Sequence, residues 1–263
     1  MKSIIKKVVP AKAREAMRDL QWKADRFGLT HQCCVCGARL KEFEMRGVAA
    51  PVLKELQVAP GGPRRVTCPH CQSYDRERLL FLYLRDKTDL FTSHKRILHF
   101  APEPCIFDKL SKGGHDMYAT VDLFPEPNVG FLTDICRLSF QTGSFDVLIC
   151  CHVLEHIPDD RLAMRELQRV VKPGGWAVIQ VPMSMKLQST IEDPSVTSED
   201  ERLKRFGQKD HVRVYAETDY LQRLRESGWC VEVVDLIAEM GDAKATKYAL
   251  FKGEKIYFCR KPA

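Results

Sequence analysis

The feature that most restricts the fold is the alternation of short apolar runs with helical patterns after Lys95. Residues 159–171 and 217–227 carry the helical period between runs that are typical of strands. Strands that alternate with helices predict a mostly parallel sheet with helices on both faces. The strand-like runs are RILHFA (96–101), MYATVD (117–122), FDVLICC (145–151), WAVIQVP (176–182), CVEVVD (230–235) and KIYFCR (255–260).

The first third of the chain has a different pattern. An amphipathic stretch at 11–27 ends at Gly28, and a loop-rich segment then leads to a predicted helix at 74–85. With about 150 residues per domain as a prior, 263 residues indicate one large domain and a smaller one. We predict an N-terminal helix (1–30), a metal-binding module with a connecting helix (31–94) and an α/β domain (95–263).

Two Cys-x-x-Cys pairs predict a metal site in the smaller region. Cys33 and Cys36 form one pair, Cys68 and Cys71 the other, and 31 residues separate the two pairs. Two such turns can converge to surround one tetrahedral Zn²⁺ with four thiolates, which leaves no open position, so we expect a structural zinc. Free core cysteines and an iron–sulfur site are the less favoured alternatives. Cys34 and His70 are alternative ligands, which leaves the register open by one residue.

Charge and cysteine content indicate a cytoplasmic protein. Forty-one Lys and Arg against 35 Asp and Glu give a net charge of +6 and a pI near 8.7, below the value of about 9 that by itself suggests nucleic-acid binding. No apolar run approaches the ~20 residues of a membrane span, and MKSIIKKVVP contains no signal-peptide core or cleavage site. Eleven cysteines, an odd number with paired spacing, favour a reducing cytosol over a disulfide framework.

Polar residues at the ends of the first two predicted strands indicate a ligand site. Ligands of open α/β sheets bind beyond the carboxyl ends of the strands. The first run is followed by Pro102-Glu103-Pro104, and the second ends in Asp122, about 20 residues later. A carboxylate at that position can accept both hydroxyls of a ribose. A lone Asp at a strand end is usually a turn cap, but this spacing favours the ribose interpretation.

Two segments, FDVLICCHVLEHI and RELQRVVKPGGWAVIQVP, resemble class I S-adenosylmethionine-dependent methyltransferases over roughly residues 95–263. The whole layout resembles the bacterial members with an N-terminal zinc module, through CPxC before a basic helix, HFAPEP, and FGQxDHVRxY at 206–215. The resemblance implies a Rossmann-like α/β fold with a seven-stranded, mostly parallel sheet. It also implies S-adenosylmethionine as cofactor.

The same resemblance implies a set of cofactor contacts. Asp122 would hold the ribose, Asp134 and Ile135 the adenine, and the segment from Cys151 to Val153 the methionine end. The sequence departs from the family at the glycine-rich turn after the first strand, where Ala101, Glu103 and Cys105 replace glycines that allow close backbone approach. The predicted cofactor-binding residues are Phe100, Ala101, Glu103, Asp122, Leu123, Asp134, Ile135, Cys151 and His152, with Glu103 a candidate partner of the cofactor's ammonium group.

Four residues are candidates for catalysis: His152, Glu155, His156 and His211. The run His152-x-x-Glu155-His156 with a later His211 resembles the metal site of small-RNA 2′-O-methyltransferases, whose run begins with Glu. Ubiquinone-pathway O-methyltransferases carry a similar Glu-x-x-Glu-His run. A second divalent metal held by these four residues is one interpretation. His211 as a general base without metal is favoured over it.

Three functions remain open at this stage. The first is methyl transfer to a hydroxyl (or amine) of a small polar or phosphorylated metabolite, sugar or natural-product intermediate, with O-methylation favoured. Arg205, Lys209 and Arg213 could contact a phosphate or carboxylate of such an acceptor. The second is an RNA methyltransferase whose zinc module holds the nucleic acid. The third is a non-catalytic scaffold with a degenerate cofactor turn. The acceptor's identity and the oligomeric state are left open.

Overall fold

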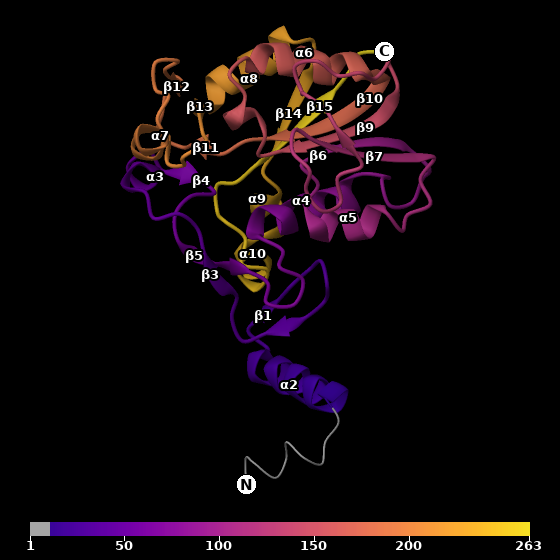
Figure 1. The fold of residues 1–263 in the computed structure, drawn as a ribbon, viewed down its shortest axis with the longest axis vertical. Helices are drawn as coiled ribbons and strands as arrows, with labels where there is room; N and C mark the ends of the chain where they lie inside the picture. Colours follow the sequence, from indigo (N-terminus) through magenta and orange to yellow (C-terminus); the bar gives the residue numbers. More distant parts are fainter. Residues whose placement is uncertain (1–10) are drawn as a thin grey trace.

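A seven-stranded sheet forms the centre of the molecule in the computed structural model, which describes residues 11–263 (Figure 1). The strand order is β14-β15-β10-β9-β6-β7-β8, and the strands from β10 to β8 run parallel while β15 is antiparallel to both of its neighbours. The predicted fold class is therefore confirmed. The strands are β6 (Arg96–Phe100), β7 (Met117–Asp122), β8 (Phe131–Leu132), β9 (Phe145–Cys151), β10 (Val171–Gln180), β14 (Cys230–Val234) and β15 (Ile256–Arg260).

Both faces of the sheet are covered by helices, as the strand pattern predicts. In β9 the side chains of Val147 and Ile149 pack into one core, and those of Leu148 and Cys150 into the other, because successive side chains of a strand point to opposite faces. The first core lies under α4 (Asp75–Lys87) and α5 (Pro104–Leu110), and the second under α6 (Asp160–Val170) and α8 (Glu217–Glu226) (Figure 1). The short helices α9 (Leu236–Met240) and α10 (Asp242–Lys247) add side chains to the first core.

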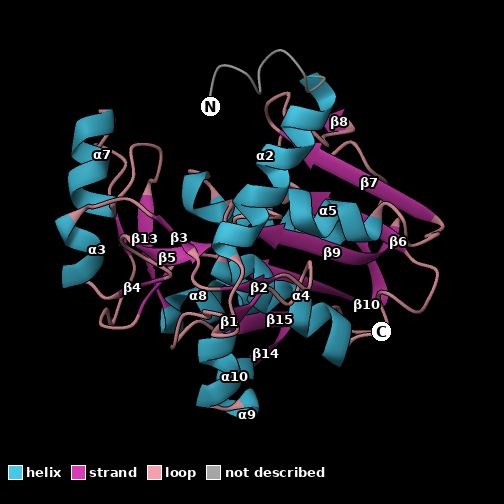
Figure 2. Ribbon diagram, turned by 90° about the horizontal axis from the view of Figure 1, so that it is seen from below, coloured by secondary structure: helices cyan, strands magenta, loops and turns pink. Residues whose placement is uncertain are grey.

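The smaller region contains the four paired cysteines and short strands. The first ten residues of the predicted segment 1–30 lie outside the described residues, and α2 spans Ala11–Arg26. Strand β1 (His31–Gln32) pairs with β2 (Arg39–Leu40), and β3 (Glu44–Arg46) pairs with β5 (Arg64–Thr67) (Figure 2). The separation of 31–94 from 95–263 as domains stays a prediction. We refer to residues 31–76 as the cysteine module.

A second sheet joins the cysteine module to the edge of the central sheet. Its order is β12-β13-β11-β4, with β4 (Val58–Ala59) antiparallel to β11 (Met183–Ser184) and β11 parallel to β13 (Arg213–Ala216). The sheet is completed by β12 (Ile191–Glu192), and α3 (Pro51–Glu55) lies beside α7 (Glu199–Phe206). Since β11 directly follows β10, this pairing brings the module to the carboxyl end of the parallel strands.

Arg78 links the module to the C-terminal part of the chain. Its side chain is fully buried and donates hydrogen bonds to the carbonyl oxygens of Val66 and Ser73, and to those of Tyr248 and Ala249. Buried guanidinium groups are stable only when their donors are satisfied. These four acceptors therefore hold the two regions together.

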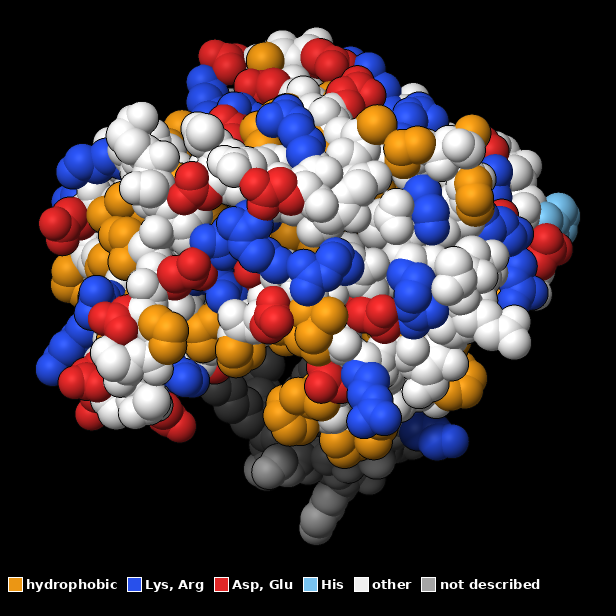
Figure 3. All heavy atoms as spheres, turned by 90° about the horizontal axis from the view of Figure 1, so that it is seen from above, with side chains coloured by type: hydrophobic (Ala, Val, Ile, Leu, Met, Phe, Trp, Pro, Cys, Tyr) orange, Lys and Arg blue, Asp and Glu red, His pale blue; other side chains and the backbone are white. Residues whose placement is uncertain are grey.

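The outer surface over α6 and α8 mixes both signs of charge. Figure 3 shows Lys and Arg interspersed with Asp and Glu on this face, without one continuous region of a single sign. None of the helices within residues 11–263 has the length and apolar character needed to cross a membrane.

Candidate active site

The four predicted cysteine ligands converge in the structure. The Sγ atoms of Cys33, Cys36, Cys68 and Cys71 all lie within 4.8 Å of one another. Two sulfur–sulfur distances are 3.6 Å, between Cys33 and Cys71, and 3.8 Å, between Cys36 and Cys68. Four sulfurs placed tetrahedrally at 2.3 Å from Zn²⁺ are about 3.8 Å apart. The arrangement fits zinc and suggests a zinc module.

Local backbone geometry explains why these four residues converge. The amide of Gly37 donates to the carbonyl of Cys33, and the amide of Gln72 donates to that of Cys68, both at 2.9 Å. Each of these residues follows the second cysteine of its pair and takes a left-handed conformation, with φ of 77° at Gly37 and 59° at Gln72. The chain can turn back there, so both sulfurs of a pair point the same way.

The alternative ligands lie outside the cluster. The Cys34 Sγ contacts the carbonyl oxygen of Arg78 at 3.7 Å, and burial raises the pKa of this thiol to about 12. The His70 ring packs against the Trp22 ring with centroids 5.3 Å apart. The cluster in the structure therefore consists of the four residues first chosen, and their role as metal ligands stays a prediction.

A pocket of about 510 Å³ lies at the carboxyl ends of β6, β7 and β9. Asp122 and Asp134 each use one carboxylate oxygen to accept a backbone hydrogen bond, from Phe124 at 3.1 Å and from Cys136 at 2.8 Å. The other oxygen of each has no hydrogen-bond partner among the described residues and can accept from a ligand. Seven of the predicted cofactor residues line this cofactor pocket: Phe100, Ala101, Asp122, Leu123, Asp134, Ile135 and His152.

The turn after β6 keeps a glycine-like backbone without glycine. Ala101 has φ of 44°, a left-handed conformation that glycine adopts at no cost and other residues rarely adopt. Its amide donates to the carbonyl of Val121 at 2.9 Å, which holds the turn in place. Strain of this kind is typical of functional sites. The turn therefore adopts, without glycine, a conformation that is typical of glycine.

Two predicted cofactor residues do not line this pocket. The Glu103 carboxylate lies 2.8 Å from Nε2 of His99 and is largely buried. Cys151 is buried, with its sulfur 3.8 Å from Oε1 of Gln180. Their contact with a cofactor stays a prediction.

A second pocket, of about 470 Å³, lies between the cysteine module and the sheet edge. The α/β region contributes His152, Pro182, Gln208 and His211, and residues of the module form the rest of the lining. We call it the acceptor pocket. His152 lines both this pocket and the cofactor pocket. Of the four predicted catalytic residues, His152 alone has this position.

His152 and Glu155 form a buried pair at the end of β9. His152 has φ of 57°, so the backbone turns sharply after the strand, and its Nδ1 lies 3.4 Å from Oε1 of Glu155. The Nε2 of His152 and Oε2 of Glu155 are buried without a hydrogen-bond partner. Burial and the charge of Arg76 lower the pKa of His152. Although burial raises the pKa of Glu155, the interaction with His152 brings it to about 2.

Glu155, His156 and His211 form an overlapping cluster. One ligand atom from each of the three lies within 4.8 Å of the others, so they could hold a divalent ion; His152 is not part of this group. The rings of His156 and His211 are perpendicular, with centroids 4.7 Å apart. His211 is 3% exposed, and burial lowers its pKa to about 4. A second metal at this cluster stays a prediction.

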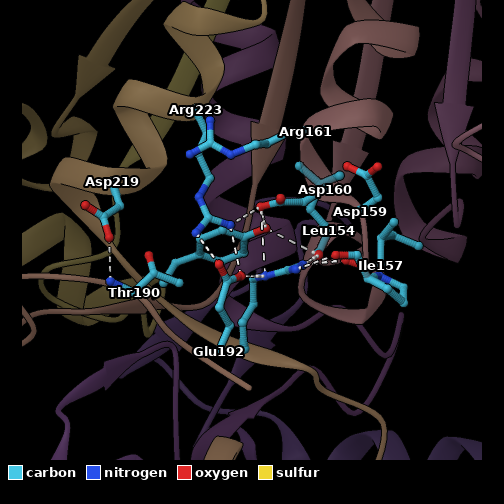
Figure 4. A network of polar contacts seen from close by, with 12 residues as sticks. Leu154, Ile157, Asp159, Asp160, Arg161, Thr190, Glu192, Asp219 and Arg223 are labelled. Atoms are coloured by element: carbon cyan, nitrogen blue, oxygen red, sulfur yellow. Dashed lines mark hydrogen bonds and ion pairs between the residues drawn. The ribbon is translucent and has the colours of Figure 1, made fainter. Parts of the chain in front are cut away.

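Arg213 holds the segment with His211 against the segment with Glu155. Its guanidinium donates to the carbonyls of Leu154, Ile157 and Pro158, and the amide of Val212 donates to the carbonyl of Glu155. Figure 4 shows the surrounding network, in which Arg223 faces both Asp160 and Glu192. This network connects β12, α6 and α8 beneath the candidate site.

The predicted role of three basic residues as phosphate contacts is not supported by their positions. Arg213 is buried and bound as described, Lys209 pairs with Glu199, and Arg205 pairs with Asp193. None of the three lines the cofactor pocket or the acceptor pocket.

The basic lining of the acceptor pocket, which includes Arg46, Arg64 and Arg76, was not predicted from the sequence. The one available signal was the basic start of the helix after CPxC, which contains Arg76. Arg46 and Arg64 lie in short strands without a periodic pattern. The pairing of β3 with β5 places Arg46 opposite Arg64, and Arg64 binds Asp75, the neighbour of Arg76 in the chain.

Known proteins support the resemblance carried by the motifs. Residues 118–179 match the family model described as a methyltransferase domain. A segment of 134 residues is 27% identical to Highly reducing polyketide synthase 40 of Fusarium pseudograminearum, covering 51% of this chain and 5% of that protein. A segment of 36 residues is 53% identical to the Ubiquinone biosynthesis O-methyltransferase of Albidiferax ferrireducens, covering 14% of each.

Among solved structures, the S-adenosylmethionine dependent methyltransferase from Mesorhizobium loti aligns with a TM-score of 0.49 at 16% identity, over 64% of this chain and 92% of that one. Of the two curated relatives named above, in contrast, the match spans only 5% and 14% of their length. The match over residues 118–179 confirms the resemblance to class I methyltransferases.

Proposed function

We propose that this chain, which carries a class I methyltransferase domain, transfers a methyl group from S-adenosylmethionine to a hydroxyl (or amine) of a small polar acceptor. The observation that carries the proposal is the position of His152, which lies between two pockets with an unpartnered buried nitrogen. Two adjoining pockets are what a transfer between a cofactor and a second substrate requires, because the reacting atoms must be held close together.

The cofactor pocket suits S-adenosylmethionine, which supplies an electrophilic methyl group when bound. Asp122 offers an unpartnered carboxylate oxygen at the end of β7, where ribose hydroxyls are bound in nucleoside-binding α/β folds. Asp134 and Ile135, the residues that the family resemblance assigns to adenine, line the same pocket. The left-handed backbone at Ala101 argues against the scaffold hypothesis, because the turn has kept the course that glycine would give it.

His152 is assigned the role of general base. The carboxylate beside Nδ1 favours the tautomer with a proton on that nitrogen, which leaves Nε2 as the acceptor. Nε2 then removes the proton from the acceptor hydroxyl. The sequence favoured His211 as the base. We assign the role to His152 instead, because His211 lines only the acceptor pocket.

The pair formed by His152 and Glu155 favours O-methylation. A neutral hydroxyl is a weak nucleophile and gains from a positioned base, whereas an unprotonated amine attacks without one. We therefore propose a hydroxyl as the methylated group, with an amine as the second choice.

The first experiment measures cofactor binding and transfer separately. Calorimetry with S-adenosylhomocysteine tests the cofactor pocket, and a mass-shift screen of hydroxyl- and amine-bearing metabolites tests transfer. With the acceptor found, His152→Gln lowers the transfer rate by about 10²–10⁴, the usual effect of removing a positioned base. His94→Gln, at an exposed histidine before β6, is the matched control and leaves the rate unchanged.

Wild-type turnover by His152→Gln contradicts the base assignment, and absence of cofactor binding contradicts the function. Loss of activity on chelation, with recovery on adding a divalent ion, would instead support a metal at Glu155, His156 and His211. In that case the carboxylate of Glu155 is a ligand, and Glu155→Gln abolishes the recovery.

A further inference from the structure

The lining of the acceptor pocket is positively charged. The lining contains three guanidinium groups, those of Arg46, Arg64 and Arg76, and one carboxylate, that of Asp75. The remaining titratable groups of the lining are the phenol of Tyr74 and the imidazoles of His152 and His211. A pocket with such an excess of cations favours an anionic ligand.

Among the described residues, only one of the three guanidinium groups forms an ion pair. Arg64 donates to both oxygens of the buried Asp75 carboxylate, at 2.9 and 3.0 Å, and to the carbonyl of Gly62. The guanidinium groups of Arg46 and Arg76 have no hydrogen bond or ion pair among residues 11–263. Arg46 is exposed, and Arg76 is half-buried with its guanidinium carbon 5.1 Å from the centroid of the Tyr74 ring.

Two of the acids that act electrostatically on Arg76 are occupied by other groups, whereas the buried Glu254 keeps one oxygen without a partner. Glu77 accepts a hydrogen bond from the amide of Tyr74, and Glu103 lies against His99. No oxygen of these carboxylates or of Glu254 lies within 4 Å of a guanidinium nitrogen of Arg76, although all three, together with Asp75, act on it electrostatically. A half-buried guanidinium without a partner retains donors that suit an oxyanion, which it can bind through two parallel hydrogen bonds.

The size of the pocket suits a small molecule. Its volume of about 470 Å³ lies within the range of ~300–1,000 Å³ typical of small-ligand sites. Gly62, which lines it, has φ of 77° and no atom within 4 Å of the position that a Cβ would take. A larger side chain there would be strained and would extend into open space, so glycine keeps the pocket free for a ligand.

We infer that the acceptor pocket binds an acceptor with an anionic group, a phosphate or carboxylate, through Arg46 and Arg76 of the cysteine module. The inference rests on the proposed function for the identity of the pocket as the acceptor site. It also assigns a role to the module: the cysteine cluster holds the turns from which the pocket wall is built.

The test uses simple anions as probes of the full chain. Glycerol 3-phosphate, inorganic phosphate and benzoate are titrated into the wild type and into Arg46→Gln, Arg76→Gln and the double variant, with ³¹P line broadening and competition as readouts. Arg65→Gln is the matched control, because Arg65 neighbours Arg64 on β5 but pairs with Glu42 outside the pocket. Circular dichroism verifies that each variant is folded.

We expect the double variant to bind the preferred anion at least tenfold more weakly, and Arg65→Gln to bind within twofold of the wild type. Preference for glycerol 3-phosphate or for benzoate identifies the anionic group. Equal binding by the double variant, or no binding of any probe by the wild type, overturns the inference.

Two other results also overturn it. If Arg76→Gln loses affinity for S-adenosylhomocysteine, Arg76 belongs to the cofactor site. If a single-stranded oligoribonucleotide binds much more tightly than any small anion, with a strong salt dependence that Arg46→Gln reduces, the ligand is nucleic acid. Failure of the wild type to bind S-adenosylhomocysteine contradicts the proposed function alone, since anion binding at the two arginines is measured independently.

Discussion

Substitution of Arg213 by Lys tests how the active-site segments are held together. The Arg213 side chain is 4% exposed and donates to three backbone carbonyls, those of Leu154, Ile157 and Pro158. Its Nε lies 2.8 Å from the Glu192 carboxylate. A lysine keeps the charge but has a single nitrogen, which cannot reach acceptors arranged around a planar guanidinium.

The expected loss follows from the acceptors left unpaired. A hydrogen bond from a charged donor contributes about 1.5–3 kcal/mol, and a buried carbonyl without a partner costs about 1–3 kcal/mol. If the ammonium retains Glu192, and the carbonyl of Leu154 keeps the hydroxyl of Tyr215 as its donor, the carbonyls of Ile157 and Pro158 lose theirs. Arg213→Lys is therefore expected to reduce the free energy of unfolding by about 3 kcal/mol.

Urea denaturation at neutral pH measures this loss as a shift of the midpoint without a change in slope. The control is Arg161→Lys, because the ion pair of Arg161 with Glu226 is about half exposed and such pairs contribute roughly 0–1 kcal/mol. Methyl transfer should also fall in Arg213→Lys at temperatures where the protein is folded, since His211 is two residues away. A loss below 1 kcal/mol, or one equal to that of the control, would refute the reasoning.

Three other substitutions test the cofactor pocket, the cysteine cluster and the acid stability of the fold. Asp122→Ala should weaken S-adenosylhomocysteine binding at least tenfold by calorimetry, since a hydrogen bond to a charged group is worth about 1.5–3 kcal/mol; Asp116→Ala, at the opposite end of β7, should not. Cys68→Ser should lower the zinc content from about one ion per chain and destabilise the cysteine module. Cys34→Ser, the control, should leave the zinc content unchanged. Folded wild-type protein without zinc would contradict the assignment. The hydrogen bond from Arg223 lowers the pKa of Glu192 to about 2, so its ion pairs stabilise the fold above the unfolded pKa of about 4.3 and lose that effect as the pH falls through about 2. The wild type should then exceed Glu192→Gln by up to about 1 kcal/mol above pH 5, and the two should converge near pH 2 in urea titrations.

Local patterns in the sequence were sufficient for the central sheet and the cysteine cluster. The predicted runs at 96–101, 117–122 and 145–151 match β6, β7 and β9 within one residue. The match is close because a buried strand is marked by the apolar residues within its own segment of the sequence. The predicted strand at 176–182 begins earlier, at Val171, since the Lys-Pro-Gly-Gly turn is included in β10 as an irregular section. Strand β8 has only two residues, too few to leave a pattern.

The candidate site divides in the same way. Asp122 and His152 could be placed from the sequence, because each stands at the end of a recognisable strand and the ends of parallel strands meet at one edge. Asp134 could be placed only through the family resemblance. The left-handed φ of Ala101 could not be predicted from a sequence position where glycine is missing. It depends on the hydrogen bond to Val121 in the neighbouring strand.

The sequence by itself determined the α/β class, the four cysteines that converge and the edge of the sheet where the predicted cofactor residues line a pocket, since each depends on local spacing. The tertiary structure alone decided that β4 pairs with β11, and hence that Arg46 and Arg76 of the cysteine module meet His152 around one pocket. It also decided which histidine lies between the two pockets. The physical reason is that such contacts join residues far apart in the chain, and their formation depends on the packing of the whole molecule rather than on any local pattern.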